Sequence, residues 1–276
     1  MVISKVWAMY FSATGTTKKI VTQIADSISR QLGTTSQEFD FTLPSGRNRQ
    51  SVFSADELVV FGTPVIAGRI PNVLLPFLDT MQGGGALAIP VCVFGNRAYD
   101  DALIEARDIL ENKGFHTVAA AAFVGEHAFS VTLGGGRPDA KDIAQAKAFS
   151  IEAAEKIKVL HLTENLPPVH LKGTPFPYRG YYQPRDSEGN FVDLRKVKPR
   201  TNLKRCRGCG ACAKMCPMGS INPDDVSQVT GICIKCNACI KKCPVKARYF
   251  DDPAFLYHKE ELETDFTQRA EPEWFL

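Results

Sequence analysis

The chain has 276 residues, of which 44% are apolar, which is ordinary for one large soluble domain or two smaller ones. Its net charge of +3 says little about its partners, because the charge is unevenly distributed along the chain. No apolar run approaches the roughly 20 residues of a membrane span, and the first residues lack the pattern of a secretory signal peptide. We therefore expect a cytoplasmic protein without a membrane-spanning segment.

Strand and helix patterns alternate along the first 160 residues. Short apolar runs such as residues 58–61 are typical of buried parallel strands, and residues 15–32 carry apolar side chains at helical spacing. The alternation predicts an α/β fold, a doubly wound parallel five-stranded sheet with helices on both faces. In chain order we expect strand 2–10, helix 15–32, strand 36–41, strand 58–61, helix 71–81, strand 86–94, helix 100–113, strand 115–124 and helix 139–160.

The composition changes after this alternating part, which we assign to a first domain, residues 1–165. Residues 166–200 are rich in proline and tyrosine, which predicts an ordered connector that packs on a domain. A cysteine-rich module at residues 201–250 follows, and residues 251–276 form an acidic tail. The sequence therefore predicts a large domain, a connector, a small domain and a tail.

Eight of the nine cysteines fall in two runs between residues 206 and 243, each spaced Cys-x-x-Cys-x-x-Cys-x-x-x-Cys-Pro. A disulfide scaffold is untypical of a cytoplasmic chain, and zinc sites typically use two well-separated pairs of ligands. The module resembles the two-cluster bacterial ferredoxins, in which three cysteines of a run and the fourth of the other run hold one cluster. The resemblance implies one [4Fe–4S] cluster on Cys206, Cys209, Cys212 and Cys243, and another on Cys233, Cys236, Cys239 and Cys216.

The ninth cysteine, Cys92, lies within the expected strand 86–94. Free cysteines commonly behave as small buried hydrophobic residues, so we expect Cys92 in the core.

The segment Ser-Ala-Thr-Gly-Thr-Thr at residues 12–17 joins the first strand to the first helix. It matches neither G-x-x-x-x-G-K-[ST] nor G-x-G-x-x-G. It places hydroxyl and backbone N–H groups at a helix start, where anions bind, although such residues can also serve only as helix caps. The pattern resembles the phosphate loop of flavodoxins, [ST]-x-T-G-x-T. The resemblance implies that the phosphate of FMN is bound by Ser12, Thr14, Gly15, Thr16 and Thr17.

Two further loops follow the third and fourth strands, at the carboxyl ends where open α/β sheets bind ligands. They resemble the isoalloxazine-binding loops of the flavodoxin-like fold, a resemblance that covers residues 1–160. The first loop contributes Pro64, Val65, Ile66, Ala67, Gly68 and Arg69 as candidate FMN-binding residues. The second contributes Phe94, Gly95, Asn96, Arg97, Tyr99 and Asp100.

One feature departs from the flavodoxin pattern. Flavodoxins commonly stack an aromatic ring on the flavin, whereas Ile66 stands near that place here, so Tyr99 or a connector tyrosine could supply the ring. His127 follows the last strand and also ends at the binding edge. It is a candidate proton donor to reduced flavin or substrate, and a purely structural histidine is the alternative.

Basic side chains dominate the cysteine module and its approach. Residues 195–250 carry thirteen lysines and arginines against Asp224 and Asp225 alone. They form either a solvated face that offsets cluster charge or a docking surface for an acidic redox protein, such as a ferredoxin, a flavodoxin or a reductase. No nucleic-acid-binding motif accompanies the charge.

The order of the two domains resembles the ferredoxin–flavodoxin fusion family, which implies FMN and two [4Fe–4S] clusters. FMN can hold one or two electrons, whereas each cluster passes one. We therefore weigh two functions: an electron-transfer protein with protein partners, and an FMN-dependent reductase of a small organic, quinone-like or otherwise unsaturated acceptor. A homodimer remains open, and so does the direction of electron flow.

Overall fold

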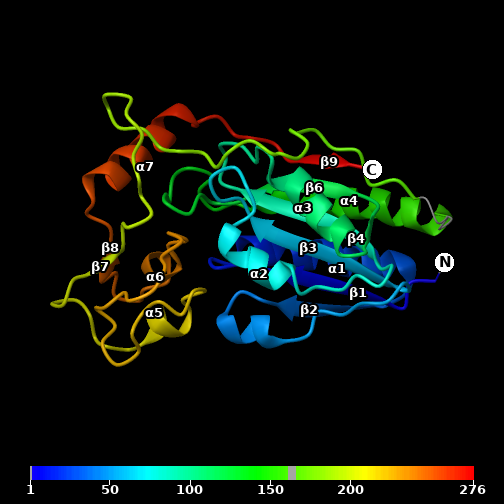
Figure 1. The fold of residues 1–276 in the computed structure, drawn as a ribbon, viewed down its shortest axis with the longest axis horizontal. Coiled ribbons are helices and arrows are strands. Elements are labelled where there is room, and N and C mark those ends of the chain that lie inside the picture. The colour runs from blue at the N-terminus through cyan, green and yellow to red at the C-terminus, as the bar shows by residue number, and fades with distance from the viewer. Residues whose placement is uncertain (1, 161–165) are drawn as a thin grey trace.

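The computed structural model describes residues 2–160 and 166–276, so the predicted boundary at residue 165 lies outside the described residues. Figure 1 shows an α/β domain with the cysteine module beside one end of its sheet, and the connector and helix α7 (Pro253–Asp265) running between the two. No helix in the described ranges is long and apolar enough to span a bilayer.

A mostly parallel sheet forms the centre of the α/β domain. Its parallel strands lie in the order β2-β1-β3-β4-β6, and the short β5 pairs with β4. This is the flavodoxin-like order, in which the strand order reverses beside the first strand and leaves a ligand-binding crevice at the carboxyl ends. The predicted fold class is confirmed. The parallel strands are β1 (Lys5–Tyr10), β2 (Thr35–Asp40), β3 (Glu57–Pro64), β4 (Leu87–Phe94), β5 (His116–Thr117) and β6 (Ala120–Val124).

The sheet carries one strand that the sequence analysis did not anticipate. Strand β9 (Glu273–Phe275) pairs antiparallel with β6. Its Trp274 ring lies 6.2 Å from the Phe149 ring, and the Tyr99 hydroxyl donates to the Glu273 carboxylate. The acidic end of the chain is therefore part of the α/β domain.

Helices cover both faces of the sheet. On one face, α1 (Thr16–Leu32) and α4 (Ala140–Val159) enclose a core with the alternate side chains of the strands. On the other, α2 (Leu75–Leu78) and α3 (Ala102–Asn112) cover a second core that includes Cys92, which is fully buried as expected.

The predicted helix 71–81 is wrong in its extent. The structure has a 3-10 turn, η2 (Asn72–Leu74), followed by the four residues of α2. Pro76 lies within this segment, and a proline inside a helix lacks the N–H and clashes with the carbonyl four residues earlier. A continuous helix from residue 71 is therefore blocked. A second 3-10 helix, η1 (Pro44–Asn48), follows β2.

The cysteine module has little regular structure. Helices α5 (Ala211–Lys214) and α6 (Ala238–Lys241) each lie within one cysteine run. Strands β7 (Arg200–Thr201) and β8 (Arg248–Tyr249) pair antiparallel and bring the two ends of the module together.

Candidate functional site

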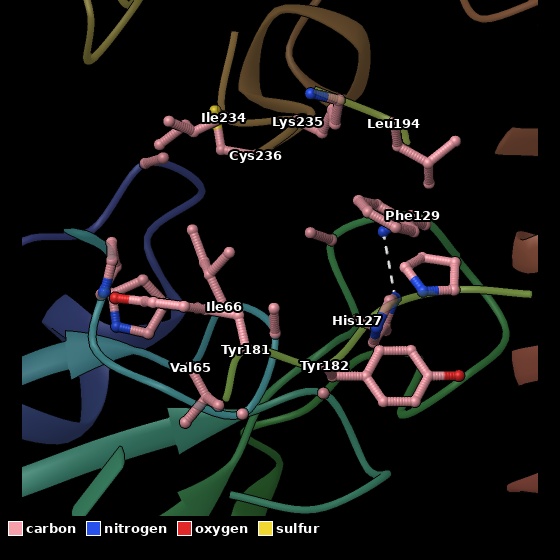
Figure 2. A pocket seen from close by; sticks show the side chains of 18 of the residues that line it. Val65, Ile66, His127, Phe129, Tyr181, Tyr182, Leu194, Ile234, Lys235 and Cys236 are labelled. Atoms are coloured by element: carbon pink, nitrogen blue, oxygen red, sulfur yellow. Dashed lines mark hydrogen bonds between the residues drawn. The ribbon is translucent and has the colours of Figure 1, made fainter. Parts of the chain in front are cut away.

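A cavity of about 1460 Å3 lies at the carboxyl ends of the parallel strands. The loops after β1, β3, β4 and β6 line it, together with the connector and residues 231–236 of the module. Figure 2 shows Ile234 and Cys236 of the module facing Ile66 and Tyr181 across the open space. The cavity therefore lies both at the crevice that the strand order creates and between the two domains.

The predicted phosphate loop borders this cavity. Thr14, Thr16 and Thr17 line it. Gly15 precedes α1 with φ of 106°, a left-handed conformation that favours glycine, and as the N-cap residue it has no side chain to cap the first N–H groups. The first N–H groups of a helix have no intrahelical partner, so this loop fits an anionic group such as a phosphate.

Ser12 plays a different part in the same loop. Its Oγ accepts from the backbone N–H of Lys18 at 2.9 Å, and its own N–H donates to Thr42 Oγ1 at 2.8 Å. Ser12 is not among the residues that line the cavity. From the module, Lys242 Nζ donates to the carbonyl of Ala13 at 3.0 Å, which brings a cation beside the loop.

The loop after β3 borders the cavity with five of its six candidates. Residues 64–68 line the cavity, and the connector is fixed to them because Tyr182 N donates to Ala67 O at 2.9 Å. Arg69 is held elsewhere: its Nε and Nη2 donate to Glu105 at 2.7 Å each, and its Nη1 donates to Arg179 O at 2.7 Å. Arg69 therefore anchors the connector to the α/β domain instead of lining the cavity.

The loop after β4 divides in the same way. Phe94, Gly95 and Arg97 line the cavity, whereas Asn96, Tyr99 and Asp100 do not. Asn96 Nδ2 donates to the carbonyls of residues 266 and 268 at 2.8 Å each, and its Oδ1 accepts from the N–H of residue 270 at 3.0 Å. Asp100 pairs with Arg97. Asn96 and Tyr99 therefore hold the end of the chain against the α/β domain.

Aromatic rings gather around the cavity from segments far apart in the sequence. Tyr181 lies beside Ile66, the residue that stands in this chain near the place of the aromatic ring of flavodoxins (Figure 2). Tyr182 stacks on His258 of α7 with ring centroids 5.7 Å apart, and the Arg97 guanidinium lies 4.7 Å from the Tyr182 ring. Sequence analysis named the connector tyrosines as possible stacking residues but missed His258, because no local pattern ties α7 to this loop.

His127 is held as a neutral imidazole. Its Nδ1 accepts from the backbone N–H of Phe129 at 3.1 Å, the bond that Figure 2 marks. Burial, with the nearby charge of Lys241, lowers the pKa of His127 to about 4. At neutral pH the ring proton therefore lies on Nε2, and His127 is suited to donating a hydrogen bond rather than to acting as a charged acid. Gly95 leaves room for the ring, since a Cβ there would come within 2.3 Å of His127 Cδ2.

The two cysteine runs share one backbone pattern. In the first run Gly208 and Gly210 flank the second cysteine with φ of 63° and 71°, and α5 follows. In the second run Lys235 and Asn237 take the same places with φ of 53° and 57°, and α6 follows. Residues other than glycine adopt positive φ only rarely. The same positive φ values at equivalent positions therefore indicate that the two loops need the same backbone conformation around their second cysteine.

Backbone N–H groups point at the last cysteine of each run. Ser220 N donates to Cys216 Sγ at 3.4 Å, and Ala247 N donates to Cys243 Sγ at 3.2 Å. Burial acts to raise the pKa of Cys243, but the backbone donors of residues 245–248 outweigh it and the pKa is lowered. Such donors stabilise the thiolate form, which is the form that binds iron.

The thiols of the predicted second set lie near one another. Burial raises the pKa of Cys236 to about 12, and the charges of Cys239, Cys233 and Cys216 add to the effect. In the described part of the chain all cysteines are free thiols, and no three Cys, His, Asp or Glu side chains converge on a single-ion site. The donor set fits iron–sulfur clusters. The division into two sets of four stays a prediction.

Lys241 of α6 fastens the module to the α/β domain. Its Nζ donates to Glu126 Oε1 and His127 O at 2.6 Å each, and to Ser130 O at 2.7 Å. Burial acts to raise the pKa of Glu126, but the hydrogen bond from Lys241 leads a set of effects that lower it. The second cysteine run is thereby held against the loop after β6.

The two runs differ in what they face. Cys233 and Cys236 of the second run line the cavity, and Cys236 also packs against a hydrophobic core of the α/β domain. Cys209 of the first run is exposed to solvent. The second run therefore faces the predicted flavin site, whereas the first run packs on the α/β domain through Met215 and exposes Cys209 to solvent.

Comparison with known proteins gives one family match: residues 205–247 match the 4Fe-4S dicluster domain. No curated protein matches the chain. A flavodoxin from the domain Archaea is 18% identical with a TM-score of 0.40, over 56% of this chain and 99% of that chain. The Streptococcus pneumonia TIGR4 flavodoxin is 18% identical with a TM-score of 0.39, over 55% and 99%.

An NADH:FMN oxidoreductase in its apo form is 15% identical with a TM-score of 0.41, over 55% of this chain and 89% of that chain. The strand order of the α/β domain is that of flavodoxins. The flavodoxin-like domain and the dicluster match together give the chain the architecture of a flavodoxin–ferredoxin fusion.

Proposed function

We propose that the chain is an electron-transfer iron–sulfur flavoprotein that holds FMN in the cavity and two [4Fe–4S] clusters in the module. The observation that carries the proposal is that residues of the second cysteine run form a wall of the cavity, while Cys209 of the first run is exposed. The two domain types indicate a redox function. The number of clusters, the binding of FMN and the order in which electrons pass are what we propose.

The residues divide among the cofactors by position. The helix start at residues 14–17 would hold the FMN phosphate, and residues 64–68 with Phe94, Gly95 and Arg97 would border its ring system. When bound, the clusters supply one-electron transfer and FMN accepts one or two electrons. His127 would donate its Nε2 proton as a hydrogen bond within the cavity, and Lys241 keeps the second run in place.

The first run would receive the partner. Exposed basic side chains surround it, and they are Lys204, Arg205, Arg207 and Lys214. Opposite charges on two proteins steer their encounter and align them. The partner that fits is an acidic one-electron carrier that docks over Cys209.

A stopped-flow experiment tests this docking. An acidic ferredoxin, reduced beforehand, is mixed anaerobically with the holoprotein at increasing ionic strength. We expect the second-order rate to fall steeply with salt, because salt screens the steering, and to fall at low salt in the double variant K204Q/K214Q. The matched control is K158Q, an exposed lysine on α4 that pairs with Glu155. A salt-independent rate would reduce the basic face to a solvated surface.

A second function, reduction of a small planar unsaturated compound, is favoured by the size of the cavity. Its volume of about 1460 Å3 exceeds the roughly 300–1,000 Å3 typical of ligand pockets. Tyr182, Phe129 and His258 line part of it. Quinones of graded size should oxidise the reduced protein with saturation kinetics, and Tyr182→Ala should raise KM. A rate that rises linearly with quinone concentration would leave only the carrier function.

A further inference from the structure

Arg248 is a buried cation inside the cysteine module. It lies on β8 with 4% of its surface exposed. Its Nη1 donates to Val226 O at 2.6 Å and to Thr201 Oγ1 at 3.0 Å. Its Nε and Nη2 are buried and have no hydrogen-bond partner within the described residues.

Such a placement is unfavourable unless something compensates for it. A buried guanidinium loses its hydration, and buried donors without partners cost free energy. Arg200 on the paired strand, in contrast, is exposed and pairs with Asp251. The free donors of Arg248 therefore require a negatively charged acceptor inside the module.

The backbone of β8 places Arg248 beside both cysteine runs. Arg248 pairs with Thr201, and the residue after Thr201 accepts through its carbonyl from the N–H of Cys206 in the first run. The residue before Arg248 donates its N–H to Cys243 Sγ of the second run at 3.2 Å, and α6 of the second run packs against β8. Arg248 therefore lies where the two runs meet.

We propose that Arg248 tunes both clusters: its free Nε–H and Nη2–H groups donate to cluster or cysteine sulfur, and its charge raises both reduction potentials. The inference rests on the proposed function, because it needs both clusters. Reduction adds one negative charge to a cluster. A cation fixed nearby in a poorly solvated interior stabilises that charge, and hydrogen bonds to sulfur and cluster environment set cluster potentials.

Three variants of the full chain test this role: R248M removes the charge and the donors, R248K keeps the charge but loses the guanidinium fork, and R200Q removes an exposed charge from the same strand pair. The measurement is an anaerobic redox titration followed by electron paramagnetic resonance. For R248M we expect the equilibrium constant for reduction of each cluster to fall at least tenfold. This fall corresponds to a decrease of about 59 mV in each midpoint potential, since each cluster takes up one electron. R248K should lie between R248M and the wild type, and R200Q should match the wild type.

Each outcome decides the proposal. Midpoints in R248M and R248K that equal those of R200Q would overturn it, and so would equal shifts in R248K and R248M, since charge would then have no part. If R248M fails to assemble clusters, R248K alone decides, because the loss of the two free donors must lower its midpoints. If the wild-type protein holds no iron, the proposed function fails instead, and iron analysis distinguishes that case.

Discussion

Removal of the Lys241 ammonium should loosen the module from the α/β domain. In K241M, Glu126 Oε1 and the carbonyls of His127 and Ser130 all lose the same donor. A hydrogen bond to a charged group contributes about 1.5–3 kcal/mol. The side chains of Lys241 and Glu126 are 15% and 26% exposed, so solvent compensates only in part.

We therefore expect the closed arrangement to lose about 3 kcal/mol, which is roughly a 100-fold change in the opening equilibrium. Hydrogen exchange measured by mass spectrometry follows this opening directly. Amides of residues 126–133 and 237–243 should exchange faster by about that factor in K241M, while the strands of the sheet stay protected.

The chain offers a matched control in its own repeat. Lys214 ends α5 as Lys241 ends α6, but Lys214 is exposed. K214M removes the same side chain from the same place in the other run and should leave exchange unchanged. Equal exchange in K241M and K214M would refute the assignment of Lys241 as the fastening residue.

Three further changes test the cofactor sites and the buried histidine. Thr14→Val should weaken FMN binding by about 1.5–3 kcal/mol, the loss of one hydrogen bond to a charged phosphate, as measured by quenching of flavin fluorescence; unchanged affinity would remove Thr14 from the site. Cys216→Ala should alter the cluster on the second run and leave a three-iron signal in electron paramagnetic resonance; loss of the other cluster would show that the predicted crossing of ligands is wrong. The pKa of His127 is about 4 in the folded protein, below its ordinary 6.5, so stability is full above pH 6.5 and falls as the pH drops toward 4. From pH 7.5 to 5.5 the free energy of unfolding of the wild type should fall by about 1.4 kcal/mol more than that of His127→Gln. The difference in Tm between the two proteins should narrow accordingly; a constant difference would mean that His127 takes up its proton equally in the folded and unfolded states.

Local patterns predicted the features that depend on neighbouring residues. Apolar runs located the parallel strands, and cysteine spacing located the module that matches a dicluster domain. The predicted helix 71–81 is wrong because Pro76 lies within it and interrupts the helix.

The remaining differences come from contacts between distant segments. Arg69, Asn96 and Tyr99 belong to the predicted flavin loops, yet each bonds to the connector or to the end of the chain. A residue's place in a loop can be predicted from sequence, but the direction of its side chain depends on what packs there. The same reason hid β9 and the position of Arg248, which becomes a buried cation only when the two runs fold together.

The central claim is that electrons reach the flavin site by way of the second cysteine run. The most direct measurement compares the wild type with Cys236→Ala, both loaded with FMN, and follows flavin bleaching after anaerobic mixing with a reduced acidic ferredoxin. We expect rapid bleaching in the wild type and bleaching at least 100-fold slower in Cys236→Ala, while a small chemical reductant bleaches both alike. Equal rates with ferredoxin would show that electrons reach the flavin without the run that forms its cavity wall.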